Sequence, residues 1–88
     1  MKPKTVKYSY SFFKGLKRFP KNQLKFLSKQ ETIFRSNIFD PRLKTHKLKG
    51  ELKEFYAFSI SYHWRIVFHL EDEDTVVFDL IETHQVYR

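Results

Sequence analysis

The sequence has 88 residues, with 17 Lys and Arg against 10 Asp and Glu and a formal net charge of +7. It contains no cysteine, which excludes disulfides, thiolate metal ligands and a cysteine nucleophile. A domain of this size buries only about 60% of its unfolded surface, so ten Phe, five Tyr and one Trp must supply a dense core. A basic and aromatic-rich chain favours a polyanionic partner such as nucleic acid.

No apolar stretch approaches the roughly 20 residues that a membrane span needs, and no signal peptide opens the chain. We therefore expect a soluble, cytoplasmic protein without a membrane partner.

The first half of the chain predicts a short strand and two helices. Alternation of Val6, Tyr8 and Tyr10 with polar residues predicts the strand. A short helix that ends before Pro20 is predicted by the helical spacing of Phe12, Phe13, Leu16 and Phe19. After Pro20, an amphipathic second helix is predicted by steps of three and four between Leu24, Leu27, Glu31, Phe34 and Ile38.

The second half predicts three strands. In residues 55–62 and onward, alternation gives one face with Phe58, Ile60, Tyr62 and Trp64 and another with Ser59, Ser61, His63 and Arg65. The acidic residues 71–74 are typical of a hairpin turn, and residues 75–81 form the last strand. The sequence thus predicts a single α+β domain spanning residues 1–88, with a helical hairpin packed on one face of a small antiparallel sheet. The other face of the sheet is left open.

Residues 42–53 form a strongly basic segment between the helices and the strands. Its lysines Lys44, Lys47, Lys49 and Lys53 are predicted to bind RNA phosphates, in a salt-dependent and sequence-blind way. A solvated loop is the alternative. His63 is predicted to join the RNA-binding group, because it shares a face with Arg65. We expect His69 to be an exposed histidine beside the acidic turn.

Three motifs in the same order resemble those of the RelE/ParE toxin superfamily. Residues 43–50 (LKTHKLKG) resemble its basic H-x-L-x-G segment, and residues 64–68 (WRIVF) resemble its central Arg-containing strand. Residues 83–88 (THQVYR) are similar to the G-T-H-x-x-Y ending of the RelE/StbE and YafQ-like branches. The chain departs from the YafQ-like pattern at Ser59 and His63, and Glu82 replaces the usual glycine.

The resemblance implies a RelE-like fold and the toxin of a type II toxin–antitoxin system. It implies a ribosome-dependent mRNA endonuclease that needs no metal and no cofactor. The implied partners are a small acidic cognate antitoxin, mRNA and the ribosome, with operator DNA reached only through the antitoxin complex. It assigns catalysis to His46 and His84 and contact with the scissile phosphate to Arg65. To Tyr87 it assigns stacking on a substrate base or orientation of that base.

The chemistry of metal-free RNA cleavage suits these residue types. One group must take the proton of the 2′-hydroxyl, another must protonate the leaving 5′-oxygen, and a cation must stabilise the phosphorane. Histidine suits both proton transfers and arginine suits the third task. Which histidine is the base stays open, and Arg65 has an alternative as an ion pair with Asp79. Two other functions also remain: a non-enzymatic ParE-like toxin that inhibits gyrase, and an inactive homologue that acts only in antitoxin and operator binding.

Overall fold

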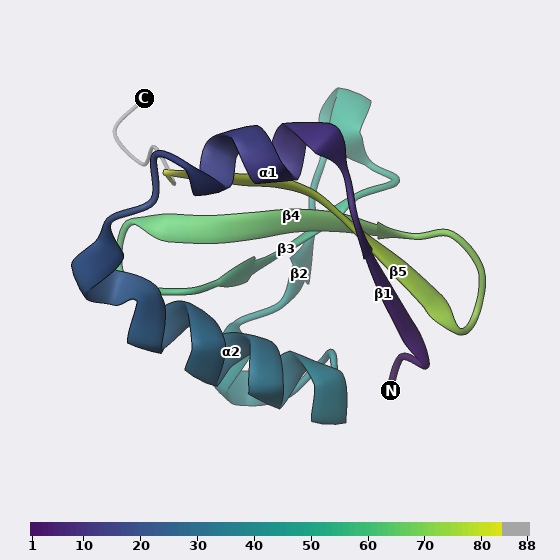
Figure 1. Cartoon of the computed structure of the whole chain (residues 1–88). Coiled ribbons are helices and arrows are strands. Elements are labelled where there is room, and N and C mark those ends of the chain that lie inside the picture. The colour runs from purple at the N-terminus through teal and green to yellow at the C-terminus, as the bar shows by residue number, and fades with distance from the viewer. Residues whose placement is uncertain (84–88) are drawn as a thin grey trace.

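In the computed structural model, residues 1–83 are described, and they form five strands, two α-helices and three 3-10 turns (Figure 1). In chain order these are β1 (Thr5–Tyr8), α1 (Tyr10–Leu16), η1 (Lys21–Gln23), α2 (Leu24–Ser36), η2 (Pro41–Leu43), β2 (His46–Lys47), η3 (Gly50–Leu52), β3 (Tyr56–Ser59), β4 (Trp64–Leu70) and β5 (Thr75–Thr83). The predicted α+β class is confirmed. No helix within residues 1–83 is long and apolar enough to cross a membrane.

The sheet has the strand order β1-β5-β4-β3-β2 and is mixed. The last four strands pair antiparallel, as consecutive strands with short links do. β1 instead lies parallel to β5, with Thr5 opposite Thr75 and Tyr8 opposite Phe78. The sequence predicted neither this parallel pairing nor the two-residue strand β2.

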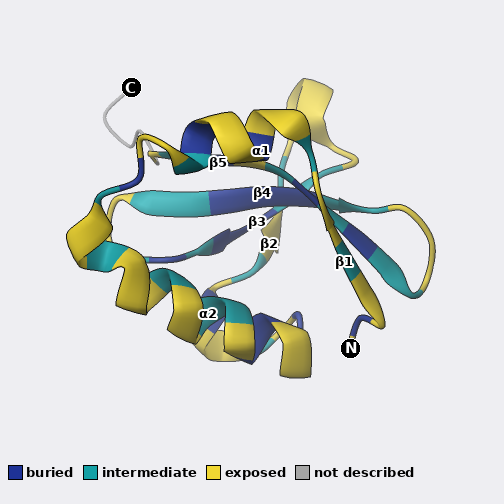
Figure 2. Cartoon of the chain, viewed as in Figure 1, coloured by how far each residue is buried: buried dark blue, intermediate teal, exposed yellow. Residues whose placement is uncertain are grey.

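Phenylalanine side chains from α2 and the sheet form the centre of the core. The Phe34 ring of α2 stacks on Phe58 with 4.6 Å between ring centroids, and its edge contacts Phe68 at 5.0 Å and Phe78 at 5.2 Å. These four rings are fully buried. The buried colour in Figure 2 follows the middle of β4 and the sides of the helices that face the sheet. Rings of this size remove a large apolar area from water, which lets a short chain form a stable core.

A β-bulge in β5 lets side chains at both ends of the strand face this core. Val76, Phe78 and Ile81 are all buried, although strict alternation would point Ile81 away from the other two. The register against β4 shifts between Val67 and Phe68, so Asp79 is the extra residue. Ser9, the N-cap of α1, donates its hydroxyl to the Asp79 carbonyl oxygen at 2.8 Å and accepts from the Phe12 N–H. The start of α1 is therefore tied to the bulge.

The predicted strand over residues 55–62 ends earlier, at Ser59. The Ile60 and Ser61 N–H groups donate to the Trp64 carbonyl oxygen, so the chain turns here. Tyr62 is 89% exposed in this turn and does not join the core face, so that part of the prediction is wrong. The alternation of apolar and polar residues continues in the sequence through residues 60–63, although these residues form a hairpin turn.

The sheet face opposite α2 is only partly open. Ala57 and Val67 lie on it, yet they are 0% and 3% exposed. The 3-10 turn η3 and the start of α1 flank this face, and a hollow remains between them. We call this surface the outer face of the sheet.

Gly15 allows α1 to approach β5 closely, which makes it a sharp test of the packing. A Cβ at this position would lie 2.7 Å from the Ile81 carbonyl oxygen and 2.9 Å from its Cγ2. We expect Gly15→Ala to lower the free energy of unfolding by roughly 1–3 kcal/mol because the backbone cannot yield without strain. Urea denaturation measures this, with the exposed Lys17→Ala as control. A Gly15→Ala protein as stable as the wild type would show that the contact is looser than described.

Candidate functional site

His46 lies on the edge strand β2, with an exposed imidazole on the outer face of the sheet. Its Nδ1 is 3.0 Å from the Lys44 carbonyl oxygen. A carbonyl oxygen only accepts hydrogen bonds, so Nδ1 must carry the proton and donate. In the neutral ring the lone pair is then on Nε2, which is the arrangement that a general base requires.

Arg65 lies on β4, two strands from His46, and is bound to a carboxylate. Its Nε and Nη2 donate to Glu82 Oε2 at 3.0 and 2.8 Å. The Arg65 side chain is 20% exposed and that of Glu82 is 37% exposed. The pair faces the outer side of the sheet, where Ser59, Arg65 and Glu82 form one row across three strands. The alternative pairing of Arg65 with Asp79 is wrong.

The strand register places His46 and Arg65 on the same face. His46 is opposite Ala57, Ala57 is opposite Val67, and Arg65 lies two residues from Val67 along β4. The two residues are separated by two strand spacings across the sheet and by two residues along a strand. Their Cα atoms are therefore about 12 Å apart. The Arg65 guanidinium, however, is bound toward β5, on the side away from β2. A phosphate held between the two side chains would therefore compete with Glu82 for Arg65.

The four predicted phosphate-binding lysines do not form one patch. Lys44 ends η2, while Lys49 and Lys53 flank η3, and all three are exposed. Lys47 is also exposed, but it pairs with Tyr56, whose ring packs against the core. Because neighbours on a strand face opposite sides, Lys47 lies on the face opposite to His46.

His63 lies in the turn before β4 rather than on a strand. Its ring contacts Tyr62 at 4.6 Å, and it lines a hollow of about 550 Å³ with Gln23, Lys25 and Phe26 at the start of α2. The prediction that His63 shares the face of Arg65 is therefore wrong. His84 and Tyr87 lie outside the described residues, and their roles remain predictions.

A second pair, between a histidine and a carboxylate, lies on the outer face and was missed in the sequence. His69 Nδ1 donates to Asp79 Oδ2 at 2.7 Å, and the His69 ring meets the Phe55 ring edge-on at 5.6 Å. His69 is 35% exposed and so is half-buried, which corrects the expectation of an exposed histidine. A signal was present: Asp79 interrupts an otherwise apolar strand, where a carboxylate requires a partner.

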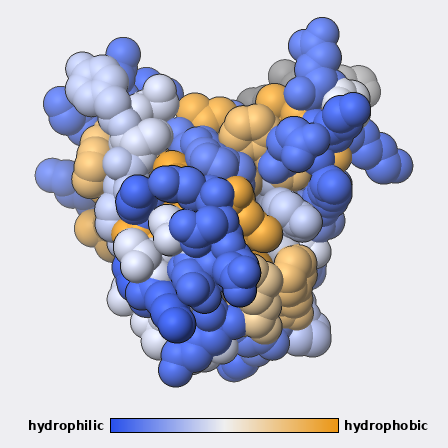
Figure 3. Space-filling view, turned by 90° about the vertical axis from the view of Figure 1, so that its right-hand side faces the viewer, coloured by the Kyte–Doolittle hydropathy of each residue, from blue (hydrophilic) through white to orange (hydrophobic). Residues whose placement is uncertain are grey.

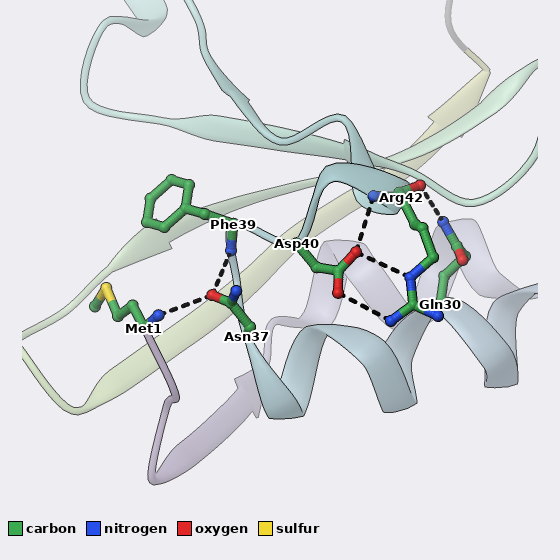
Figure 4. A network of polar contacts seen from close by, with 6 residues as sticks. All are labelled: Met1, Gln30, Asn37, Phe39, Asp40 and Arg42. Carbon is green, nitrogen blue, oxygen red and sulfur yellow. Dashed lines mark hydrogen bonds and ion pairs between the residues drawn. The ribbon is translucent and has the colours of Figure 1, made fainter.

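A polar network fixes the basic segment to α2 (Figure 4). Arg42 donates from Nε and Nη2 to the two carboxylate oxygens of Asp40 at 3.0 and 2.9 Å. Gln30 of α2 donates to the carbonyl oxygens of Arg42 and Ser59. These bonds position η2, and with it the chain that leads to His46. In residues 1–83, no cluster of three or more His, Cys, Asp or Glu side chains is placed to hold a metal ion.

No family model matches the sequence, and neither does any curated protein. Solved structures do match the fold. A metal-bound toxin from Helicobacter pylori is 28% identical, with a TM-score of 0.70 over 91% of this chain and 93% of that one. YafQ from the E. coli DinJ–YafQ toxin–antitoxin complex is 23% identical, with a TM-score of 0.65 over 90% of each chain. A YoeB/ParE toxin from Agrobacterium tumefaciens is 15% identical, with a TM-score of 0.71 over 97% of this chain and 100% of that one.

These matches define the class of the fold: a helical hairpin on a small mixed sheet, shared with bacterial toxins. The chain has the fold of the RelE/ParE-like toxin superfamily, and the resemblance seen in its sequence is confirmed.

The Asp40–Arg42 pair predicts a pH dependence of stability. Hydrogen bonds from Arg42 lower the pKa of the Asp40 carboxyl from 3.8 to about 2. Because the pKa is lower in the folded state, ionised Asp40 stabilises the fold above the unfolded pKa, and this contribution is lost as pH falls from about 4 through 2. Thermal unfolding between pH 5 and 2 should show a smaller fall in midpoint for Asp40→Asn than for the wild type. The control Glu54→Gln should keep the wild-type slope, and identical slopes for all three proteins would contradict the role of Asp40.

Proposed function

We propose that this chain is the toxin of a toxin–antitoxin pair and that it cleaves mRNA on the ribosome. The observation that carries the proposal is the placement of His46 and Arg65 on one face of the sheet, beside the basic segment. The fold supports the toxin assignment, since its structural neighbours are described as toxins and one was solved in a toxin–antitoxin complex. An acidic antitoxin suits the basic charge of the chain. Action on ribosomes would take place in the cytoplasm.

The proposed reaction is a transesterification within the RNA strand. His46 Nε2 takes the proton of a 2′-hydroxyl, and the 2′-oxygen attacks the adjacent phosphorus. The bond from phosphorus to the 5′-oxygen breaks, and that oxygen takes a proton from a general acid, for which His84 is the predicted residue. Arg65 stabilises the charge on the phosphorane oxygens. The products are a 2′,3′-cyclic phosphate and a free 5′-hydroxyl.

Substitutions of His46 and Arg65 test this proposal directly. We expect His46→Ala to slow cleavage by about 10²–10⁴-fold and Arg65→Ala by about 10²–10³-fold. Primer extension on a translated message after addition of purified protein measures the cut. Lys29→Ala, an exposed change on α2, should cut as the wild type does. Unchanged cleavage by both site variants would refute the assignment.

Glu82 has an opposing effect under this proposal. Because it holds the Arg65 guanidinium on the side away from His46, it competes with the substrate phosphate. Glu82→Gln keeps the shape of the side chain but removes its charge, so it should increase the rate of message cleavage several-fold. The charge-matched control Glu51→Gln lies in η3 and should have a smaller effect. A decrease with Glu82→Gln would mean that the carboxylate positions Arg65 productively.

The same ion pair also favours an alternative function. If Glu82 keeps Arg65 neutralised, the protein binds a target without cutting RNA, as a ParE-like inhibitor of gyrase or as an inactive homologue in the antitoxin complex. Supercoiling by purified gyrase in the presence of the chain separates these cases. Inhibited supercoiling with intact message identifies the gyrase inhibitor, and the absence of both effects identifies the inactive homologue.

A further inference from the structure

A hollow of about 320 Å³ opens on the outer face of the sheet, between the start of α1 and η3. Val67 and Leu80 form its floor, and Leu52 and Phe55 form the wall beside η3. Figure 3 shows this region as a notch between two prominences, with hydrophobic side chains inside it. We call it the α1–η3 groove. Its volume is at the lower end of the roughly 300–1,000 Å³ typical of pockets for small ligands.

Two carboxylates line the groove, and each accepts a hydrogen bond from a neighbouring side chain. Asp79 accepts from His69 through Oδ2, and Glu82 accepts from Arg65 through Oε2. The bulge in β5 is what brings Asp79 to this position. A carboxylate has about four lone-pair sites over its two oxygens, so these bonds leave acceptor capacity for a ligand. The groove therefore combines apolar surface with rigidly held hydrogen-bond acceptors.

The rim of the groove carries the opposite charge. Lys14 and Arg18 of the α1 region line a smaller hollow that shares Ser11 and Leu80 with the groove. On the other side, Lys53 follows the wall residue Leu52. A basic peptide would be repelled by this rim, and an acidic peptide would place its carboxylates against Asp79 and Glu82. A ligand with an apolar body, hydrogen-bond donors and an anionic linker fits all three features.

We propose that the α1–η3 groove binds one unpaired RNA base that carries an exocyclic amino group. The base lies over Val67 and Leu80 and against Phe55, its amino group donates to Asp79, and its flanking phosphates contact Lys14 and Arg18. Adenine, cytosine and guanine present such an amino donor. Uracil has none: its one donor on the pairing edge, N3–H, lies between two carbonyl oxygens that a carboxylate repels. The groove thus selects against uracil. The inference rests on the proposed action on RNA and adds a specificity site distinct from His46.

Binding of uncleavable RNA tests the base preference without requiring cleavage. The probes are fluorescein-labelled 2′-O-methyl hexanucleotides of adenosine, cytidine or uridine, titrated with the full chain and followed by anisotropy. We expect the wild type to bind the adenosine and cytidine probes about tenfold more tightly than the uridine probe. Asp79→Asn should bring this ratio close to one. Glu73→Gln removes the same charge from the exposed acidic turn and should keep the wild-type ratio.

Further variants test the apolar floor and the basic rim of the groove separately from the acceptor Asp79. Leu80→Ala, at a half-exposed position, should weaken binding of the adenosine and cytidine probes several-fold while the protein stays folded. Lys14→Ala and Arg18→Ala should weaken all three probes alike, each lowering the salt slope by about one without changing the ratio.

Equal binding of all three probes by the wild type, or an unchanged ratio in Asp79→Asn, would overturn the inference. So would tight binding of an arginine-rich peptide that depends on Asp79 in the absence of a base preference, because the groove would then be a peptide site. Cleavage on the ribosome is measured separately. A base preference without cleavage would leave this inference standing and refute the proposed function, and cleavage without the preference would do the reverse.

Discussion

One extra residue in β5, Asp79, determines which side chains of this strand face the core and which face the outer side of the sheet. Without the bulge at Asp79, Phe78 and Ile81 could not both face the core. With it, Ile81 turns inward beneath Gly15 of α1, and Asp79 turns toward His69 on the outer face. The Ser9 hydroxyl links the bulge to the first turn of α1. The same few contacts thus determine how α1 packs, the register of β5 and the shape of the α1–η3 groove.

The outer face is consequently not a uniformly basic surface. Its lysines lie at the rim, while two carboxylates, Asp79 and Glu82, are held at the centre by His69 and Arg65. If the chain acts on RNA as proposed, this arrangement separates two tasks. Cations attract the phosphates and give affinity that salt weakens, whereas fixed acceptors in an apolar groove distinguish bases. The positive net charge of the whole chain therefore does not indicate which charges lie at the centre of the outer face.

The sequence predicted the helices and strands better than it predicted where they end and which strands pair. Helical spacing and proline placed both helices, and the apolar strands were found, because these signals are local. The parallel pairing of β1 with β5 is a contact across the whole chain that no local pattern encodes. Alternation continued through residues 60–63, so His63 was assigned to a strand instead of a turn. Motif order made His46 and Arg65 candidate site residues, and their roles stay predictions. The partner of Arg65 depends on strand register, and that register depends on the bulge.

The chemistry of the cut ends tests the central claim most directly. A message cut on the ribosome by the purified chain should carry a 2′,3′-cyclic phosphate and a 5′-hydroxyl, because the attacking oxygen comes from the RNA itself and histidines move the protons. Ligation assays specific for each type of end distinguish these products. Ends with a 3′-hydroxyl and a 5′-phosphate would show that water is the nucleophile, and the account of His46 and Arg65 would then be wrong.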